Sequence, residues 1–161
     1  MNRLGDTLIH WYGNEPLIKE LIKNNAEFIL IGGLAVAWYC SERQADDMDI
    51  LVNPTEENST SISMALTNLH INGHNAHSFE KLSLQVPLKN GLYADILTPK
   101  EGSLSFNEIL NEAIDAKIFN LPVKLASLKT LISLKEHAIS TDENNAEKHT
   151  QDIMLLKRYD V

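Results

Sequence analysis

The segment from Phe28 to Val52, FILIGGLAVAWYCSERQADDMDILV, most constrains what this chain can fold into. It begins with an apolar, β-branched run that stops at Gly32-Gly33, and a second apolar run follows a group of aspartates. A run that is apolar at every position is typical of a strand buried on both faces. The segment therefore predicts a strand over 27–31, a glycine turn, a helix over 34–39 and a second strand over 48–52.

Apolar periodicity and turn residues predict the remaining elements. Helices are expected over 3–12, 15–25, 55–69, 105–112, 127–139 and 143–158, and strands over 81–87, 92–97, 114–119 and 123–125. The Asn90-Gly91 pair is typical of a hairpin turn. The prediction is an α/β (α+β) fold, a short mixed sheet of about five strands flanked by helices with a C-terminal helical pair. It forms one domain over 1–161, with a core over 26–125 and C-terminal helices over 126–161.

Charge and composition exclude some classes of protein. The net charge of −8 argues against a protein that coats nucleic acid, because such binding depends on neutralising phosphates. A local basic groove stays open, and lysines 117, 124, 129 and 135 would form one if they share a face. The single Cys40 excludes an intramolecular disulfide. No apolar run reaches the about 20 residues that span a bilayer, so we expect a soluble, cytoplasmic protein.

Asp47 and Asp49 carry the first sign of chemistry. Side chains alternate along a strand, so both carboxylates are expected on one face. Two adjacent carboxylates are unfavourable unless a cation lies between them, and oxygen ligands suit Mg²⁺ or Mn²⁺. Gly32-Gly33 lies between a strand and a helix, where backbone amides can bind phosphate.

Asp95 is the third carboxylate of the predicted site. It stands among apolar residues in GLYADILTP, and burying an unpaired carboxylate there would be costly. Phosphoryl-type transfer with two metal ions needs a third carboxylate that binds the second ion or deprotonates the attacking hydroxyl. We therefore expect Asp47, Asp49 and Asp95 to be both metal ligands and catalytic residues.

The combination of Gly-Gly, D-x-D and a later lone Asp resembles the DNA polymerase β-like nucleotidyltransferase superfamily. The chain is most similar to small stand-alone bacterial members, a group that includes abortive-infection (AbiEii-type) toxins and antibiotic nucleotidyltransferases. RQADDMDILV resembles their R-x-T-x-D-[IL]-D-[IL]-[LV] segment, with Arg43, Asp47 and Asp49 in register. The chain departs from the group's pattern at Leu34, where many members have Ser, and at Ala45, where Thr is usual.

The C-terminal part carries a weaker resemblance. VKLASLKTLISLKEHA and EKHTQDIMLLKRY resemble the helical pair that often follows the sheet in this group. A Lys (here Lys135) and a Lys-x3-Asp (here Lys148 and Asp152) recur there. Without the resemblance, these three residues are predicted to lie on solvated helix faces.

The resemblance implies a metal-dependent nucleotidyltransferase that moves an NMP from an NTP to a hydroxyl acceptor, either a small molecule, an RNA such as tRNA, or a protein. Gly32, Gly33, Arg43 and Lys135 would bind the nucleotide, and Mg²⁺ or Mn²⁺ would be the cofactor. A homodimer or a cognate antitoxin-like partner is a further expectation. The alternative is a catalytically silent member that binds a nucleotide or a partner, in a toxin–antitoxin-like pair. A metal-dependent phosphohydrolase is a third hypothesis.

Structural explanations compete with each of these assignments. D-x-D by itself also fits a solvated turn before an edge strand, and Gly-Gly fits a plain strand-to-helix turn. Arg43 either pairs with a nearby aspartate or orients a phosphate. The spacing of His70, His74 and His77 suggests zinc, but their segment is predicted to be loop and offers no fourth ligand.

Overall fold

The computed structural model describes residues 14–40, 42–43, 45, 47–88, 92–141 and 146–159. The predicted helix over 3–12, the Asn90-Gly91 turn and the break before the last helix lie outside these residues.

Helices and strands alternate through most of the described chain. The helices are α1 (Asn14–Lys23), α2 (Gly32–Tyr39), α3 (Glu56–Asn68), α4 (Phe106–Glu112), α5 (Leu128–Thr141) and α6 (Ala146–Tyr159). The strands are β1 (Phe28–Ile31), β2 (Met48–Val52), β3 (Gln85–Leu88), β4 (Ala94–Leu97), β5 (Ile114–Ile118) and β6 (Leu121–Leu125). The predicted α/β class is confirmed.

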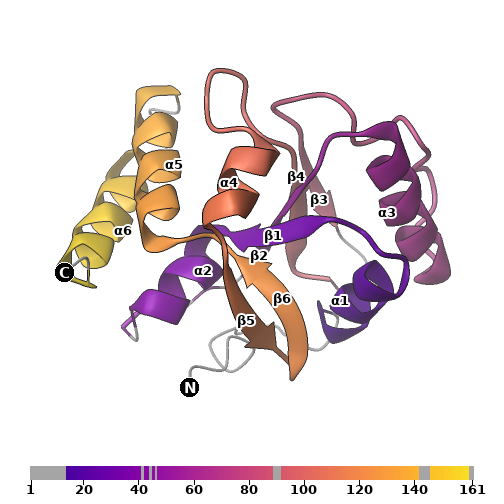
Figure 1. Ribbon diagram of the computed structural model, residues 1–161, viewed down its shortest axis with the longest axis horizontal. Coiled ribbons are helices and arrows are strands. Elements are labelled where there is room, and N and C mark those ends of the chain that lie inside the picture. Colours follow the sequence, from indigo (N-terminus) through magenta and orange to yellow (C-terminus); the bar gives the residue numbers. More distant parts are fainter. Residues whose placement is uncertain are drawn as a thin grey trace.

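The strands form one mixed six-stranded sheet with the order β3-β4-β2-β1-β6-β5. β2 and β4 run parallel, as do β1 and β6, while the other three neighbouring pairs are antiparallel. The two strands of the opening segment, β1 and β2, thus lie at the centre of the sheet (Figure 1). This central place explains why their sequences are apolar at nearly every position.

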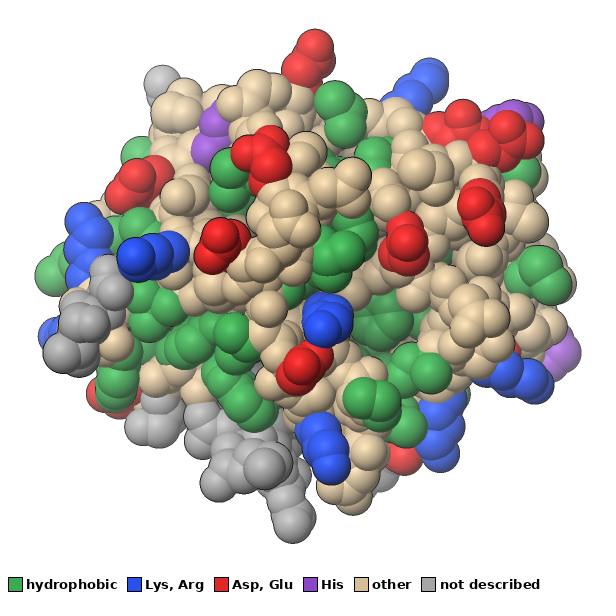
Figure 2. Space-filling model, viewed as in Figure 1, with side chains coloured by type: hydrophobic (Ala, Val, Ile, Leu, Met, Phe, Trp, Pro, Cys, Tyr) green, Lys and Arg blue, Asp and Glu red, His purple; other side chains and the backbone are tan. Residues whose placement is uncertain are grey.

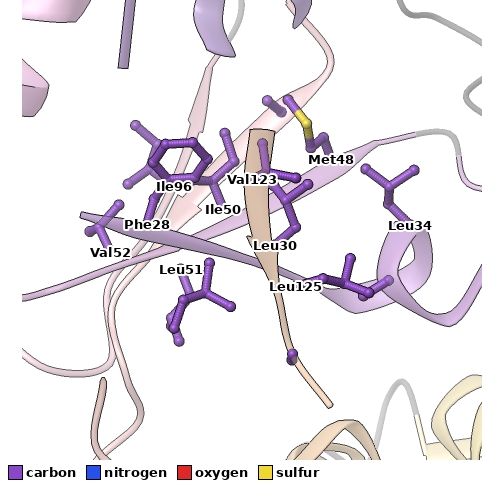
Figure 3. Packing of buried hydrophobic residues seen from close by; sticks show 14 of the residues in the cluster. Phe28, Leu30, Leu34, Met48, Ile50, Leu51, Val52, Ile96, Val123 and Leu125 are labelled. Carbon is purple, nitrogen blue, oxygen red and sulfur yellow. The ribbon is translucent and has the colours of Figure 1, made fainter. Parts of the chain in front are cut away.

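The central strands present different residues to the two faces of the sheet. Leu30 pairs with Ile50 and Ile31 pairs with Asp49, so each pair shares a face. Leu30 and Ile50 are fully buried in the apolar core. Figure 3 shows Leu51 on the opposite side of the ribbons from Ile50. Asp49 therefore projects from the same face as Leu51, and not into the core around Ile50.

The predicted strand over 81–87 begins late, at Gln85. Ser83 has a positive φ of 62°, and its amide donates to the carbonyl of Pro99. The Leu84 amide donates to the side chain of Thr98, whose hydroxyl donates to the Lys81 carbonyl. Residues 81–84 are bound to the segment that follows β4, which prevents them from pairing as strand.

The last hairpin also turns earlier than predicted. The strands predicted over 114–119 and 123–125 leave a turn at 120–122, but Phe119 and Asn120 form it, with positive φ angles of 53° and 63°. Strand β6 therefore starts at Leu121 and contains Pro122, which pairs with Lys117 of β5. Two consecutive residues with positive φ suit the tight turns that match strand twist.

The C-terminal helices α5 and α6 pack side by side and both contact α2 (Figure 1). The Ser127 hydroxyl accepts a hydrogen bond from the Thr130 amide and so caps α5. Helix α6 packs through Ile153 and Leu156, which are buried, whereas Met154 is 60% exposed. Among the described helices, none combines the length and apolar character needed to cross a membrane.

Candidate functional site

The glycine turn joins β1 directly to α2. Gly32 has a φ of 72°, and a Cβ added there would lie 2.1 Å from Oδ2 of Asp49. A Cβ on Gly33 would lie 2.8 Å from Nη2 of Arg43. Position 32 therefore requires glycine for backbone conformation and space, whereas a side chain at position 33 would have to displace the Arg43 guanidinium. No side chain caps the first turn of α2, which leaves its amides available to a ligand.

Two aspartates lie side by side on the sheet next to this turn. Asp49 of β2 is in register with Asp95 of β4, and neighbouring strands are separated by about 4.8 Å. Burial, and to a smaller extent the charge of Asp95, raise the pKa of Asp49 to about 6. Asp47, just before β2, is exposed and adds a smaller upward effect. The chain thus holds a carboxylate cluster that its own cations do not balance.

A cavity of about 430 Å³ opens over these residues. All seven residues that the sequence assigns to the site line it: Gly32, Gly33, Arg43, Asp47, Asp49, Asp95 and Lys135. They come from the first, middle and last thirds of the chain. The strand order places the glycine turn on one side of Asp49 and Asp95 on the other.

A buried ion-pair network holds two residues that line the cavity, Arg43 and Lys135. Asp152 of α6 accepts a hydrogen bond from Nε of Arg43 at 2.9 Å, and its other oxygen lies 3.1 Å from Nζ of Lys135. Burial raises the pKa of Asp152, but Lys135 and Arg43 lower it more, so it lies below its ordinary value. Asp152 therefore stays ionised and holds both cations beside the cavity.

This network corrects the prediction that Lys135 and Asp152 lie on solvated helix faces. The two residues are only 8% and 2% exposed. A signal for this was present in the sequence. Lys135 continues the buried register of Leu131 and Ala138, and Asp152 is four residues before Leu156. The predicted pairing of Arg43 with an aspartate is confirmed, but the partner lies 109 residues away in sequence.

Sequence reasoning missed Gln85 on the edge strand β3. Its side-chain amide donates to Oδ2 of Asp95 at 2.9 Å. Pro87 is directly opposite Asp95 in the antiparallel pair, so Gln85 is its diagonal neighbour on the same face. This bond holds one carboxylate oxygen of Asp95, a residue that lines the cavity.

The other charged residues that line the cavity are mainly basic. Lys100 and His137 lie on the β3–β4 side, and Lys148 and His149 come from α6. Of the lysines considered for a basic strip, Lys135 lines the cavity, whereas Lys117, Lys124 and Lys129 do not. On the face drawn in Figure 2, acidic and basic side chains are scattered and not gathered by sign.

The three histidines considered for zinc have separate surroundings. His74 stacks on Phe79, and His77 pairs with Glu80. Within the described residues, one group of three metal-type ligands has its atoms within 4.8 Å of one another, and it consists of Glu56, His77 and Glu80. This group lies outside the cavity. The cavity aspartates do not meet the same spacing.

Comparisons with known proteins identify the fold. An antigenic nucleotidyltransferase-like protein from Paracoccidioides brasiliensis superposes with a TM-score of 0.53 at 12% identity, over 89% of this chain and 75% of its own. ANT(2″)-Ia, solved in complex with adenylyl-2″-tobramycin, gives 0.54 at 13% identity, over 88% and 84%. The fold is nucleotidyltransferase-like. No family model and no curated protein sequence matches the chain.

Proposed function

We propose that this protein is a metal-dependent nucleotidyltransferase, which moves an NMP from an NTP to a hydroxyl acceptor and releases pyrophosphate. The observation that carries the proposal is the pair of in-register carboxylates, Asp49 and Asp95, directly beside a glycine turn with an uncapped helix start. The nucleotidyltransferase-like fold supports it. Carboxylates next to a phosphate-binding turn suit transfer at phosphorus.

Each residue has a role that follows from its position. The amides at the start of α2, with Arg43 and Lys135, would hold the β- and γ-phosphates, because they lie on the glycine side of Asp49. Asp95 lies on the other side and would accept the proton of the attacking hydroxyl. The acceptor oxygen then bonds to the α-phosphorus while the bond to the pyrophosphate oxygen breaks.

Asp47, Asp49 and Asp95 fit Mg²⁺ or Mn²⁺ by their chemistry. All three offer hard carboxylate oxygens, and the pKa of Asp49 is raised because burial and the charge of Asp95 outweigh the effect of Lys135 and Lys148. When bound, the ions would neutralise charge on the phosphates. The surface group Glu56, His77 and Glu80 is too far from this chemistry to take part, because it does not line the cavity.

The test combines binding and transfer. Thermal shift and calorimetry with each NTP and Mg²⁺ should show a metal-dependent response in the wild-type protein and none in Asp47→Ala/Asp49→Ala. NTP labelled at the α-phosphate should then transfer its label to a hydroxyl acceptor. Asp115→Asn is the matched control, because Asp115 is an exposed acid that pairs with Lys124 outside the cavity. An unchanged response in the double variant would contradict the proposal.

A silent member of the fold is the second candidate, and Leu34 favours it. Leu34 is fully buried and offers no hydroxyl to a phosphate. In that case the cavity would bind a nucleotide and regulate contact with a partner, as in a toxin–antitoxin-like pair or a homodimer. Metal-dependent NTP binding without transfer of the α-label to any acceptor or to water would favour this candidate. Release of labelled NMP without an acceptor would instead indicate a phosphohydrolase.

A further inference from the structure

We propose that the β3–β4 side of the cavity is the acceptor subsite, and that it takes a small hydroxyl compound carrying an anionic group, such as a phosphate monoester. This inference rests on the proposed function and specifies its acceptor. It depends on three features: the order of groups across the sheet, the charges on this side, and a wall that is fixed by hydrogen bonds.

The order of groups across the sheet separates donor from acceptor. Gly32 follows β1, Asp49 lies on β2 and Asp95 lies on β4, so the aspartates stand between the glycine turn and the edge strand β3. An attacking hydroxyl approaches phosphorus opposite the leaving pyrophosphate. With the pyrophosphate on the glycine turn, the hydroxyl must arrive from the β3–β4 side, where Asp95 can take its proton.

The charges on that side favour an anion. Besides Asp95, the lining residues placed there by chain position or contact are Lys100, which follows β4, and His137, which lies near Gly102. The acids next to them in sequence, Glu101 and Glu136, are exposed and do not line the cavity. An acceptor with several ammonium groups would lose water around each charge and meet one carboxylate there, Asp95, which the proposed reaction uses for the hydroxyl. A phosphate or carboxylate on the acceptor would instead pair with Lys100 and receive a hydrogen bond from His137.

Hydrogen bonds within the chain itself fix the wall of this subsite. The amide of Ser83 donates to the Pro99 carbonyl at 2.9 Å, and the amide of Glu101 donates to the Ser83 hydroxyl at 3.0 Å. Thr98, only 2% exposed, bonds to both Leu84 and Lys81. These contacts join the segments before β3 and after β4 into one unit that presents Lys100. His137 of α5 lies close to Gly102, which belongs to the segment after β4.

The size of the cavity favours a small acceptor over a nucleic acid. Its volume of about 430 Å³ is within the range of about 300–1,000 Å³ typical of small-molecule pockets. A bound RNA would need further cations along its backbone. Lys117, Lys124 and Lys129 do not continue the cavity's basic lining.

The test uses Lys100→Glu, with Lys117→Glu as the control that makes the same change in net charge at an exposed site outside the cavity. Ribose 5-phosphate, ribose and an amino sugar with several ammonium groups are titrated without NTP, and the ring signals of His137 are followed by NMR. The sugar phosphate should shift these signals in the wild type and in Lys117→Glu. Lys100→Glu should weaken its binding by roughly 10-fold or more, since a charge-assisted hydrogen bond becomes a repulsion.

The outcomes separate this inference from the proposed function. Tighter binding of the amino sugar in the wild type, or equal binding of the sugar phosphate by both variants, would overturn the anionic subsite. So would binding of a tRNA-length RNA with a steep salt dependence while the sugar phosphate leaves His137 unchanged. If the sugar phosphate binds as expected but NTP and Mg²⁺ give no response, the subsite stands and the proposed function fails.

Discussion

Two acids at the site are balanced in opposite ways: Asp49 lines the cavity, and Asp152 lies against two of its lining residues, Arg43 and Lys135. Asp152 is held by Arg43 and Lys135, and its pKa lies below the ordinary value although it is buried. Asp49 faces Asp95 instead, and its pKa is raised to about 6. The same type of side chain is thus stabilised in its charged form at position 152 and destabilised in its charged form at position 49.

The difference indicates which acid serves the structure and which serves a ligand. A carboxylate whose charge is balanced by the chain needs nothing more, and it can hold two cations in place. A carboxylate that is buried beside another acid raises the free energy of the ligand-free protein, and this cost is recovered when a cation binds. The Asp49 group is therefore the expected metal and substrate site, and the Asp152 network is its support.

The largest expected effect is on transfer activity. Asp49→Ala/Asp95→Ala should lower the rate of label transfer by roughly 10³-fold or more, because it removes both the metal ligands and the proton acceptor. The rate is measured with α-labelled NTP and Mg²⁺ at saturating acceptor. Asp115→Asn should leave it unchanged. A double variant that retains more than a tenth of the activity would break the assignment of the two acids.

The next largest effect is on stability, and it concerns the ion pairs of Asp152. Asp152→Asn should lower the free energy of unfolding by about 3–5 kcal/mol, because Arg43 and Lys135 lose the charge that compensates them. Urea denaturation at pH 7 measures this loss. A change below about 1 kcal/mol, as for an exposed ion pair, would contradict the supporting role. Lys124→Ala provides that surface reference.

Asp49→Asn should act in the opposite direction on stability. The folded-state pKa of about 6 lies above the ordinary 3.8, so metal-free Asp49 favours folding below pH 4 and loses this contribution as pH rises through 6. Removing the charge should therefore raise stability at pH 7 by roughly 1–3 kcal/mol and leave it nearly unchanged at pH 4. Denaturation of both proteins at the two pH values checks the sign. A less stable variant at pH 7 would refute the account of Asp49.

The smallest effect is expected at Gln85. Its hydrogen bond to Asp95 is exposed, so Gln85→Ala should change unfolding free energy by less than about 1 kcal/mol. If the bond orients Asp95 toward the acceptor, kcat should fall by roughly 3- to 10-fold with little change in NTP affinity. Kinetics with varied NTP and acceptor separate a change in kcat from a change in NTP affinity. A large loss of NTP affinity would place Gln85 on the donor side instead.

The sequence predicts the part of the site that is local. Gly32, Gly33, Asp47 and Asp49 lie within one strand-turn-helix-strand segment, where alternation and glycine chemistry determine their placement. Asp95 could also be predicted from the sequence, because an acid within an otherwise apolar strand needs an explanation. These residues line one cavity, and their roles stay predictions.

The rest depends on contacts between distant segments, which local patterns do not contain. Arg43 and Asp152 meet only because α6 packs against α2. The late start of β3 results from hydrogen bonds between Ser83 and the segment after β4. The buried positions of Lys135 and Asp152 were readable from helical spacing, but charged residues are rarely assigned to a core before their partners are known.

The most direct test of the central claim is a ¹³C NMR titration of the Asp49 and Asp152 carboxyl groups, with and without Mg²⁺ and a non-hydrolysable NTP. We predict that Asp49 titrates near pH 6 in the ligand-free protein. With Mg²⁺ and nucleotide it should remain ionised well below that pH, while Asp152 stays ionised in both conditions. An Asp49 titration that is unaffected by Mg²⁺ and nucleotide would contradict the claim that this acid binds a cation.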